Sequence, residues 1–456
     1  MMHPEDLPDA FVAQLNLLLG EEAAAALITA ITQTAAPLSI RYHPKKKGQP
    51  LPEYAPVLWS DYGFYLDERK SFTLDPLFHA GVYYVQEAAS MLIGWILQQL
   101  PGAAQSPRIL DLCGAPGGKS TLIQSVVSDQ SLLVANEVIR NRYPILRENL
   151  VKWGYPNKLL TNADASAFEA YSGFFDVVLV DAPCSGEGLF RKDPQAVGEW
   201  SLHNQQLCAG RQKRILSSAV AAVRPGGWLL YSTCTYNPDE NEANVRWLQE
   251  DFGFEPIRLA LPESWGVLSM GAGYQCFPHL VKGEGFYMAC LQKTGGQPYH
   301  APKKNVGKSY WKPLAGKNMD PLKSWLHNPD QLDVFSNEQG QLRAWPSIHT
   351  NDILDLMRGF PGAEPGVAIG QLLRQEFIPA HDLIVSTLLS PDIPLYNLDT
   401  TSALRCLKKE NIEVPHAPKG WIVAAFENTP IALLKNIGSR INNYYPKEWR
   451  IRMNID

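Results

Sequence analysis

The sequence lacks several features that would place it in common classes of protein. No apolar run approaches the roughly 20 residues of a membrane-spanning helix, and the opening MMHPEDLPDAF has no basic region followed by an apolar one. The seven cysteines are an odd set without CxxC spacing, which disfavours both a disulfide framework and a cysteine-rich zinc site. The ten histidines show no ligand spacing, so we expect no metal. These absences predict a cytoplasmic protein with free thiols and no membrane partner.

The sequence also has no excess of positive charge, since its net charge is −5. This charge argues against a uniformly basic nucleic-acid binder. The charges are nevertheless segregated along the chain. Five lysines and no acid lie between Thr294 and Lys317, whereas eleven acids face four bases from Met319 to Thr400. From Thr401 to the end, nine bases face five acids. If RNA binds, we expect its phosphates to contact the linker and the C-terminal segment.

The length of 456 residues predicts about three domains at roughly 150 residues each. Helical spacing of apolar residues up to Ile31, followed by a basic, proline-rich stretch, predicts a small N-terminal module of the RNA-binding type. The Gly-, Pro- and Lys-rich segment near residue 300 predicts a linker. The predicted divisions are an N-terminal module at 1–75, a catalytic domain at 76–293, a basic linker at 294–317, a mixed domain at 318–390 and a final domain at 391–456.

From Arg108 onwards, short apolar runs alternate with helical patterns. The runs are RILDL, LLVANEV, KLLTNAD, FFDVVLVDA and GGWLLYST, with a closing pair near GFEPIRL and GFYMACLQ. Such alternation predicts an α/β fold with a doubly wound, mostly parallel sheet, because parallel strands need long crossover connections. Ligands of these sheets bind beyond the carboxyl ends of the strands. Three motifs follow strands there: DLCGAPGGKST from Asp111, DAPCSGEG from Asp181 and STCTYNPDENE from Ser232.

The first motif is a glycine-rich turn that two kinds of ligand could use. Gly114, Gly117 and Gly118, with Pro116, allow the backbone to approach a ligand at a helix N-terminus. CGAPGGKS differs by one residue from the phosphate-binding pattern GxxxxGK[ST], so a P-loop NTPase is an alternative. Glu137 lies about twenty residues beyond the glycines, where an acid takes ribose hydroxyls in doubly wound folds. We therefore favour an adenosine held by its sugar.

Two further carboxylates, Asp164 and Asp181, close successive predicted strands. An acid-lined cleft suits a cationic cofactor, and S-adenosylmethionine carries a positively charged sulfonium. Asp164 has an alternative role as the N-cap of the next helix, since Asp-Ala-Ser is good capping chemistry. The sequence therefore predicts a methyl-donor site.

Cys184 and Cys234 indicate which kind of methyl transfer this site would perform. Carbon 5 of a pyrimidine is a poor nucleophile until a thiolate adds at carbon 6, and Cys234 could make that attack. Cys184 could then assist removal of the carbon 5 proton and release of the enzyme. Lys119 could help to generate the thiolate. The alternative is that both are buried core cysteines, the role we expect for the remaining set of Cys208, Cys276, Cys290 and Cys406.

The three motifs together resemble those of the Nol/Nop/Sun family of RNA 5-methylcytosine methyltransferases. The segments PLSIRYHPKK and VQEAASM also resemble that family's N-terminal and helix-entry segments. GFPGAEPGVAIGQLLRQEFIPAHDL and LKNIGSRINNYYPKEWRIRM are similar to the C-terminal regions of its bacterial small-subunit rRNA members, the RsmF type. The resemblance therefore covers nearly the whole chain.

The resemblance implies a Rossmann-like S-adenosylmethionine-dependent sheet, with the strands before Cys184 and Cys234 side by side and a PUA-like RNA-binding domain at the C-terminus. Cys234 would be the nucleophile and Cys184 the release thiol, and Asp181 could also touch the target base. The terminal basic-aromatic stretch could contact phosphate and stack bases, or be a tail with packed aromatics. The implied cofactor-binding residues are Cys113, Gly114, Ala115, Pro116, Gly117, Gly118, Lys119, Glu137, Asp164 and Asp181.

One departure is visible, because the family's Ala-Ala-Pro-Gly-Gly-Lys begins here with Gly114, a mild change in a tight turn. The expected activity is methylation of cytosine C5 in rRNA, most simply 16S, by a monomer. Two alternatives stay open: a P-loop-like NTPase, and a non-enzymatic RNA-binding factor of ribosome assembly on an inherited methyltransferase fold.

Overall fold

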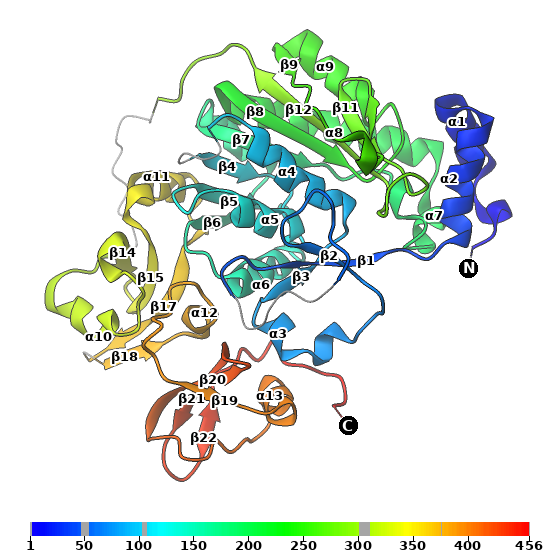
Figure 1. The fold of residues 1–456 in the computed structure, drawn as a ribbon. Helices are drawn as coiled ribbons and strands as arrows, with labels where there is room; N and C mark the ends of the chain where they lie inside the picture. The colour runs from blue at the N-terminus through cyan, green and yellow to red at the C-terminus, as the bar shows by residue number, and fades with distance from the viewer. Residues whose placement is uncertain (1, 47–53, 103–106, 301–310, 375, 456) are drawn as a thin grey trace.

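The structure is a computed structural model that describes residues 2–46, 54–102, 107–300, 311–374 and 376–455. Its centre is a ten-stranded sheet with the order β10-β11-β12-β8-β7-β4-β5-β6-β16, and β9 pairs with β12 (Figure 1). The five middle strands are parallel. They are β4 (Arg108–Asp111), β5 (Leu132–Asn136), β6 (Lys158–Thr161), β7 (Phe175–Asp181) and β8 (Val223–Thr233).

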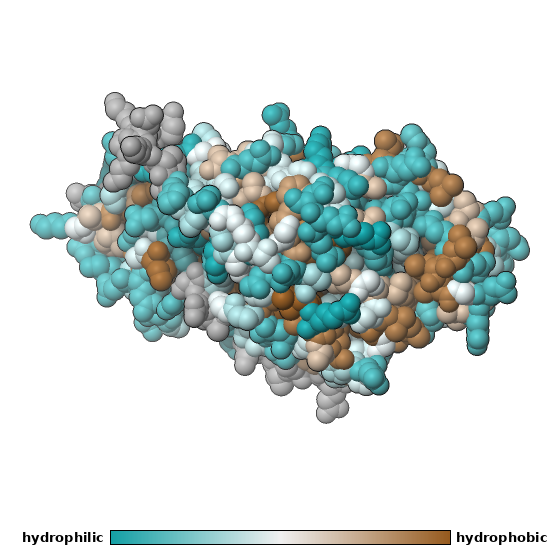
Figure 2. All heavy atoms as spheres, turned by 90° about the horizontal axis from the view of Figure 1, so that it is seen from above, coloured by the Kyte–Doolittle hydropathy of each residue, from teal (hydrophilic) through white to brown (hydrophobic). Residues whose placement is uncertain are grey.

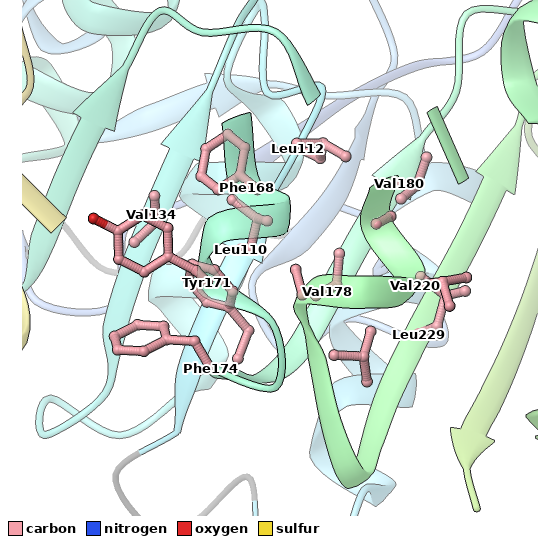
Figure 3. Close-up of a cluster of buried hydrophobic side chains, with 14 of the residues drawn as sticks. Leu110, Leu112, Val134, Phe168, Tyr171, Phe174, Val178, Val180, Val220 and Leu229 are labelled. Carbon is pink, nitrogen blue, oxygen red and sulfur yellow. The ribbon is translucent and has the colours of Figure 1, made fainter. Parts of the chain in front are cut away.

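Helices cover both faces of this sheet because alternate strand residues point to opposite sides. Leu110, Val178 and Val180 pack on one face against the helices that follow β6 and β7 (Figure 3), and Ile109 and Leu179 pack on the other. The first layer contains the 3-10 helix η4 (Ala165–Tyr171) with α8 (Leu202–Ala222), α9 (Glu242–Phe252) and α11 (Thr350–Gly359). The second layer contains α4 (Leu92–Gln99), α5 (Gly118–Val126) and α6 (Tyr143–Trp153). The predicted doubly wound core is thus confirmed.

The outer strands of the sheet are antiparallel, which makes it mixed rather than mostly parallel. The reason is local: the chain after α9 returns through short turns instead of crossover helices, and short turns join antiparallel strands. Four of these strands are β9 (Phe254–Pro256), β10 (Leu268–Met270), β11 (Gly273–Cys276) and β12 (Phe286–Lys293). The fifth, β16 (Glu364–Pro365), comes from the C-terminal part of the chain and pairs with β6.

The N-terminal segment forms two helices and part of a small sheet. α1 (Asp9–Leu19) and α2 (Glu21–Gln33) pack on α7 (Gln195–Glu199) and on residues that follow the thiol-bearing motifs. A three-stranded sheet joins β1 (Leu38–Tyr42), β2 (Gly63–Leu66) and β3 (Tyr83–Val85). This sheet therefore extends past residue 75. Seen from above, the surface is mostly hydrophilic, and apolar side chains gather towards the end where these helices lie (Figure 2).

The C-terminal part contains two further sheets, which lie below the central sheet in Figure 1. The first has five strands: β13 (Lys312–Pro313), β14 (Leu332–Ser336), β15 (Gln341–Pro346), β17 (Val367–Leu373) and β18 (Glu376–Pro379). The second has four: β19 (Leu395–Asn397), β20 (Gly420–Phe426), β21 (Thr429–Asn436) and β22 (Ile441–Asn443). β20 and β21 pair in antiparallel fashion at the centre of this second sheet. The short helices are α3 (Pro76–His79), α10 (Asp320–Lys323), α12 (His381–Ile384) and α13 (Thr400–Leu407).

Residues 301–310 of the predicted linker, with three of its five lysines, lie outside the described residues. Among the helices of the described ranges, none combines the length and the apolar character needed to cross a bilayer.

Candidate active site

The glycine-rich turn lies at the carboxyl end of β4, as predicted, and leads into α5 at Gly118. The backbone N–H of Gly114 donates to the carbonyl of Asn136 at the end of β5, at 2.7 Å. Gly117 has a φ of +115°, a conformation that side chains rarely adopt, and an added Cβ would lie 3.2 Å from the Cβ of Asn149. Asn149 also donates to the carbonyl of Pro116 at 2.7 Å. The turn is thus fixed by the neighbouring strand and helix.

Glu137 and Asp164 stand at the ends of the next two strands and line one cavity of about 850 Å³, together with Cys113. Glu137 is buried, and its Oε1 accepts from the backbone N–H of Ile139 at 2.8 Å. Asp164 is exposed and caps η4 by accepting from the N–H of Ser166 at 3.1 Å. That hydrogen bond holds the pKa of Asp164 below its usual value. The capping alternative therefore holds, and the same carboxylate also faces the cavity.

The cavity fits an adenosine cofactor in size, and its lining offers carboxylates beside the arginines Arg142, Arg211 and Arg214. Its volume lies within the roughly 300–1,000 Å³ of small-molecule sites. The carboxylates of Glu137 and Asp164 can accept from ribose or ammonium groups and attract a sulfonium. Val138 and Ile139 add an apolar wall, with 51% and 44% of their surfaces exposed. Residues 114–119 and Asp181 do not line this cavity.

Two residues that shape the cavity were not predicted. Asn136 donates to the carbonyls of Leu112 and Ala163, at 3.1 and 3.0 Å, and so ties three strand ends together. Arg142 donates to the carbonyl of Ala115 at 2.6 Å and lies 3.8 Å from Glu137. The sequence signal for Asn136 is its position as the last residue of a strand, and Arg142 directly precedes a helix.

The second part of the site lies where β7 and β8 end side by side, in the register that pairs Asp181 with Ser232. Two and three residues further on, the thiols of Cys234 and Cys184 meet with 3.0 Å between their sulfur atoms. The backbone N–H of Cys234 also donates to the sulfur of Cys184 at 3.3 Å. Both side chains are partly exposed. The predicted adjacency of these two strands is confirmed, and neither thiol is sealed in the core.

Asp181 and Lys119 form an ion pair beside the thiols, with 2.7 Å between Nζ and Oδ2. The other oxygen of Asp181 accepts from the hydroxyl of Ser232 at 2.8 Å. Burial acts to lower the pKa of Lys119, but the charge of Asp181 outweighs it, and the pKa is raised. Lys119 is therefore a permanent cation at this edge of the sheet.

The hydrogen bond with Cys234 is the main cause that raises the pKa of Cys184 well above its usual value, and burial adds to it. The pKa of Cys113 is also raised above its usual value, and burial is the main cause. Cys276, Cys290 and Cys406 are buried away from these loops, and Cys208 is half-buried on α8.

The P-loop NTPase alternative requires a free hydroxyl at Ser120, and this hydroxyl is already engaged. Ser120, which would hold a nucleotide-bound magnesium ion in a P-loop, is buried and donates its hydroxyl to Asp111 at 2.5 Å. Lys119 is engaged by Asp181. The geometry thus favours a nucleoside cofactor over a nucleoside triphosphate.

Comparison with known proteins agrees with this site. A model of the 16S rRNA methyltransferase RsmB/F family matches residues 100–292, the model of the N-terminal domain of 16S rRNA methyltransferase RsmF matches 7–88, and the model of the RsmF PUA domain matches 394–451. Ribosomal RNA small subunit methyltransferase F of Escherichia coli O139:H28 is 31% identical over 410 residues, 86% of this chain and 84% of the relative. The Enterobacter sp. strain 638 protein of that name is 30% identical over 413 residues, 87% and 84% of the two chains.

Two solved structures share the fold. A methyltransferase homologue from Pyrococcus horikoshii has a TM-score of 0.55 and 26% identity, covering 64% of this chain and all of that one. NSun6 from Pyrococcus horikoshii, solved with SFG, has a TM-score of 0.54 and 20% identity with the same coverage, and supports the fold alone.

The doubly wound sheet, its glycine-rich turn and the family models define an S-adenosylmethionine-dependent methyltransferase. More specifically, the chain belongs to the RsmF family of 16S rRNA cytosine-C5 methyltransferases, with an N-terminal domain and a C-terminal PUA domain.

Proposed function

We propose that this RsmF-type protein methylates carbon 5 of a cytosine in 16S rRNA, with Cys234 as the nucleophile and Cys184 as the release thiol. The observation that carries the proposal is the 3.0 Å contact between the two sulfur atoms at the ends of neighbouring parallel strands. A single target base can lie against both sulfurs at once. The raised pKa of Cys184 favours its protonated form, and we therefore assign Cys184 as the donor in this sulfur–sulfur contact.

The proposed reaction begins with addition of Cys234 to the cytosine ring and ends with release of Cys234 from the methylated base. The thiolate of Cys234 bonds to carbon 6, and the electron pair of the C5–C6 double bond moves to carbon 5, which becomes able to take a methyl group. Cys184, which is partly exposed, first gives its proton to solvent water, and the resulting thiolate acts as the base. It then takes the proton from the methylated carbon 5, the C5–C6 double bond re-forms, and Cys234 leaves as a thiolate. Lys119 and Asp181 lie where they can hold the polar edge of the cytosine.

S-adenosylmethionine, when bound, supplies the methyl group. We propose that Cys113, Glu137 and Asp164 hold it in the cavity of about 850 Å³. The turn residues 114–119 are linked to that cavity through Arg142, which lines it and donates to the carbonyl of Ala115. We further propose that the enzyme works in the cytoplasm, where free thiols stay reduced, and as a monomer, since one chain supplies the thiols, the carboxylates and the cavity.

Two cysteine substitutions test the division of roles. Cys234→Ala should abolish methyl transfer to small-subunit rRNA. Cys184→Ala should leave Cys234 joined to RNA as an adduct that survives a denaturing gel. Cys208→Ala is the matched control, since this half-buried thiol lies on α8 outside both loops, and it should methylate normally.

Retained methylation by Cys234→Ala would contradict the proposed nucleophile. Intact ribosome assembly in Cys234→Ala cells that have lost the methyl transfer would favour the non-enzymatic RNA-binding factor. Tight ATP binding without S-adenosylmethionine binding would favour the NTPase alternative. Bisulfite mapping of rRNA from cells with and without the gene identifies the modified cytosine.

A further inference from the structure

The loop that carries Cys184 is anchored from behind by two buried polar side chains, Glu240 and Gln212. The backbone N–H of Ser185 donates to Oε2 of Glu240 at 3.0 Å. Gln212 donates to the carbonyl of Pro183 at 3.0 Å and to the same Oε2 at 2.7 Å. The peptide groups on both sides of Cys184 are therefore held by one carboxylate and one amide.

The anchor is itself fixed in orientation. The amide oxygen of Gln212 accepts from the hydroxyl of Tyr231 at 3.1 Å and from Asn244 at 2.9 Å. Its amide nitrogen must consequently face Pro183 and Glu240. Gln212 lies on α8 and Glu240 lies just before α9, so the Cys184 loop is tied to both helices.

Core stability does not explain this arrangement. Glu240 and Gln212 are 0% exposed, and Oε1 of Glu240 has no hydrogen-bond partner among the described residues. Burial raises the pKa of Glu240 to about 7. A buried carboxyl with one unsatisfied oxygen costs free energy relative to an apolar side chain. Because burial of the Glu240 carboxyl costs free energy and this carboxyl contacts the loop of a reactive thiol, a role in holding that loop explains its presence better than core stability does.

We propose that Glu240 and Gln212 are positioning residues that hold the sulfur of Cys184 against the target base and thereby set the rate at which Cys234 is released from methylated RNA. This inference rests on the proposed release role of Cys184. The contact between Ser185 Oγ and Thr235 Oγ1, at 2.8 Å, ties the two thiol loops to each other. The hydrogen bond of Gln212 ties the Cys184 loop to α8, and that of Glu240 ties it to the segment that leads from Cys234 into α9.

The test compares two rates in the full-length protein with small-subunit rRNA: single-turnover methyl transfer and decay of the protein–RNA adduct. Glu240→Ala and Gln212→Ala should slow adduct decay by about tenfold or more, the effect of losing a hydrogen bond to a charged group. The methylated adduct should then accumulate on a denaturing gel, as in Cys184→Ala. Methyl transfer in the first turnover should change much less.

Two variants separate positioning from general damage. Glu240→Gln should restore release, because both contacts use one oxygen and a glutamine oxygen can occupy its place. Glu242→Gln is the matched control: it also removes a carboxylate with a buried, unpartnered oxygen, in the same segment, but it does not contact the Cys184 loop. Glu242→Gln should release RNA at the wild-type rate.

The outcomes distinguish this inference from the proposed function. If Cys184→Ala retains the adduct while Glu240→Ala and Gln212→Ala release RNA normally, the positioning role is wrong and the thiol roles stand. If Cys184→Ala itself releases normally, the proposed function fails. Equal loss of both rates without adduct would show a merely structural role and overturn the inference. If Glu240→Ala does not fold, the adduct-decay rates of Gln212→Ala and Glu240→Gln decide whether the positioning role is correct.

Discussion

Replacing Glu364 by glutamine should loosen the C-terminal modules from the methyltransferase sheet. Glu364 lies in β16 and accepts from Nε of Arg147 at 2.9 Å and from the guanidinium of Arg343 at 2.6 Å. The hydroxyl of Tyr143 donates to its other oxygen at 3.0 Å. Arg147 and Tyr143 belong to α6 and Arg343 to β15, so one carboxylate joins two parts of the fold.

The size of the effect follows from burial and charge. Removing one partner of a fully buried ion pair costs about 3–5 kcal/mol. Because 25% of the Glu364 side chain stays exposed and glutamine keeps one acceptor, we expect about 2–3 kcal/mol. Burial acts to raise the pKa of Glu364, but Arg343 and Arg147 lower it below its usual value. The stabilisation is therefore present at neutral pH and is lost as the pH falls through that lowered pKa.

Hydrogen exchange measures this effect locally, which matters in a chain of several domains. The N–H of Gly366 donates to the carbonyl of Lys158 at 2.7 Å and reports on the β16–β6 junction. Its exchange should accelerate by roughly 30- to 150-fold in Glu364→Gln, the factor that corresponds to 2–3 kcal/mol.

The control is Asp320→Asn, which removes an exposed partner of Lys323 and should change stability by no more than about 0.5 kcal/mol. Unchanged exchange at Gly366 in Glu364→Gln would refute the reasoning that this ion cluster couples the two parts.

Three further predictions concern the cofactor end of the sheet. Glu137→Gln should weaken S-adenosylmethionine binding by about tenfold or more in calorimetric titration, because a carboxylate is the stronger acceptor for ribose hydroxyls; unchanged affinity would remove Glu137 from the site. Gly117→Ala should destabilise the protein by about 1–2 kcal/mol in thermal unfolding, because its φ of +115° is strained for alanine; an equal melting temperature would contradict this. Burial raises the pKa of Asp111 to about 7, so its contribution to stability is present in acid and is lost as the pH rises from about 4 towards 7. Asp111→Asn should flatten the stability profile over that window, and a profile like the wild type would refute the assignment.

The parallel core could be predicted from the sequence because it depends on local patterns, whereas the meeting of the thiols also required the strand order that the resemblance implied. Apolar runs that end in Asp111, Asp181 or Ser232 mark strand ends, and the carboxyl ends of parallel strands share one edge of the sheet. The resemblance to the family supplied the order of the strands before Cys184 and Cys234. The roles of the individual site residues stay predictions.

Contacts between distant segments could not be predicted in this way. β16 has only two residues, Glu364 and Pro365, and no periodicity marks so short a strand. Gln212 lies in the middle of a 21-residue helix, where a polar residue is ordinarily solvent-facing. Its role depends on Glu240 and on the Cys184 loop, 28 and 29 residues away in sequence, at places that only the folded chain brings together. Such contacts between distant segments depend on tertiary packing and leave no signal in the local sequence pattern.

The N-terminal helices pack against residues that follow Cys184 and Cys234. The ring of Phe11 lies 5.0 Å from that of Phe190 and 5.7 Å from that of Trp200, and the same cluster contains Tyr236, two residues beyond Cys234. α1 and α2 therefore cover the apolar backs of both thiol loops, although Phe190, Trp200 and Tyr236 come far later in the sequence. Removal of α1 and α2 would uncover these three side chains, and the backbone behind both sulfurs would lose that apolar support.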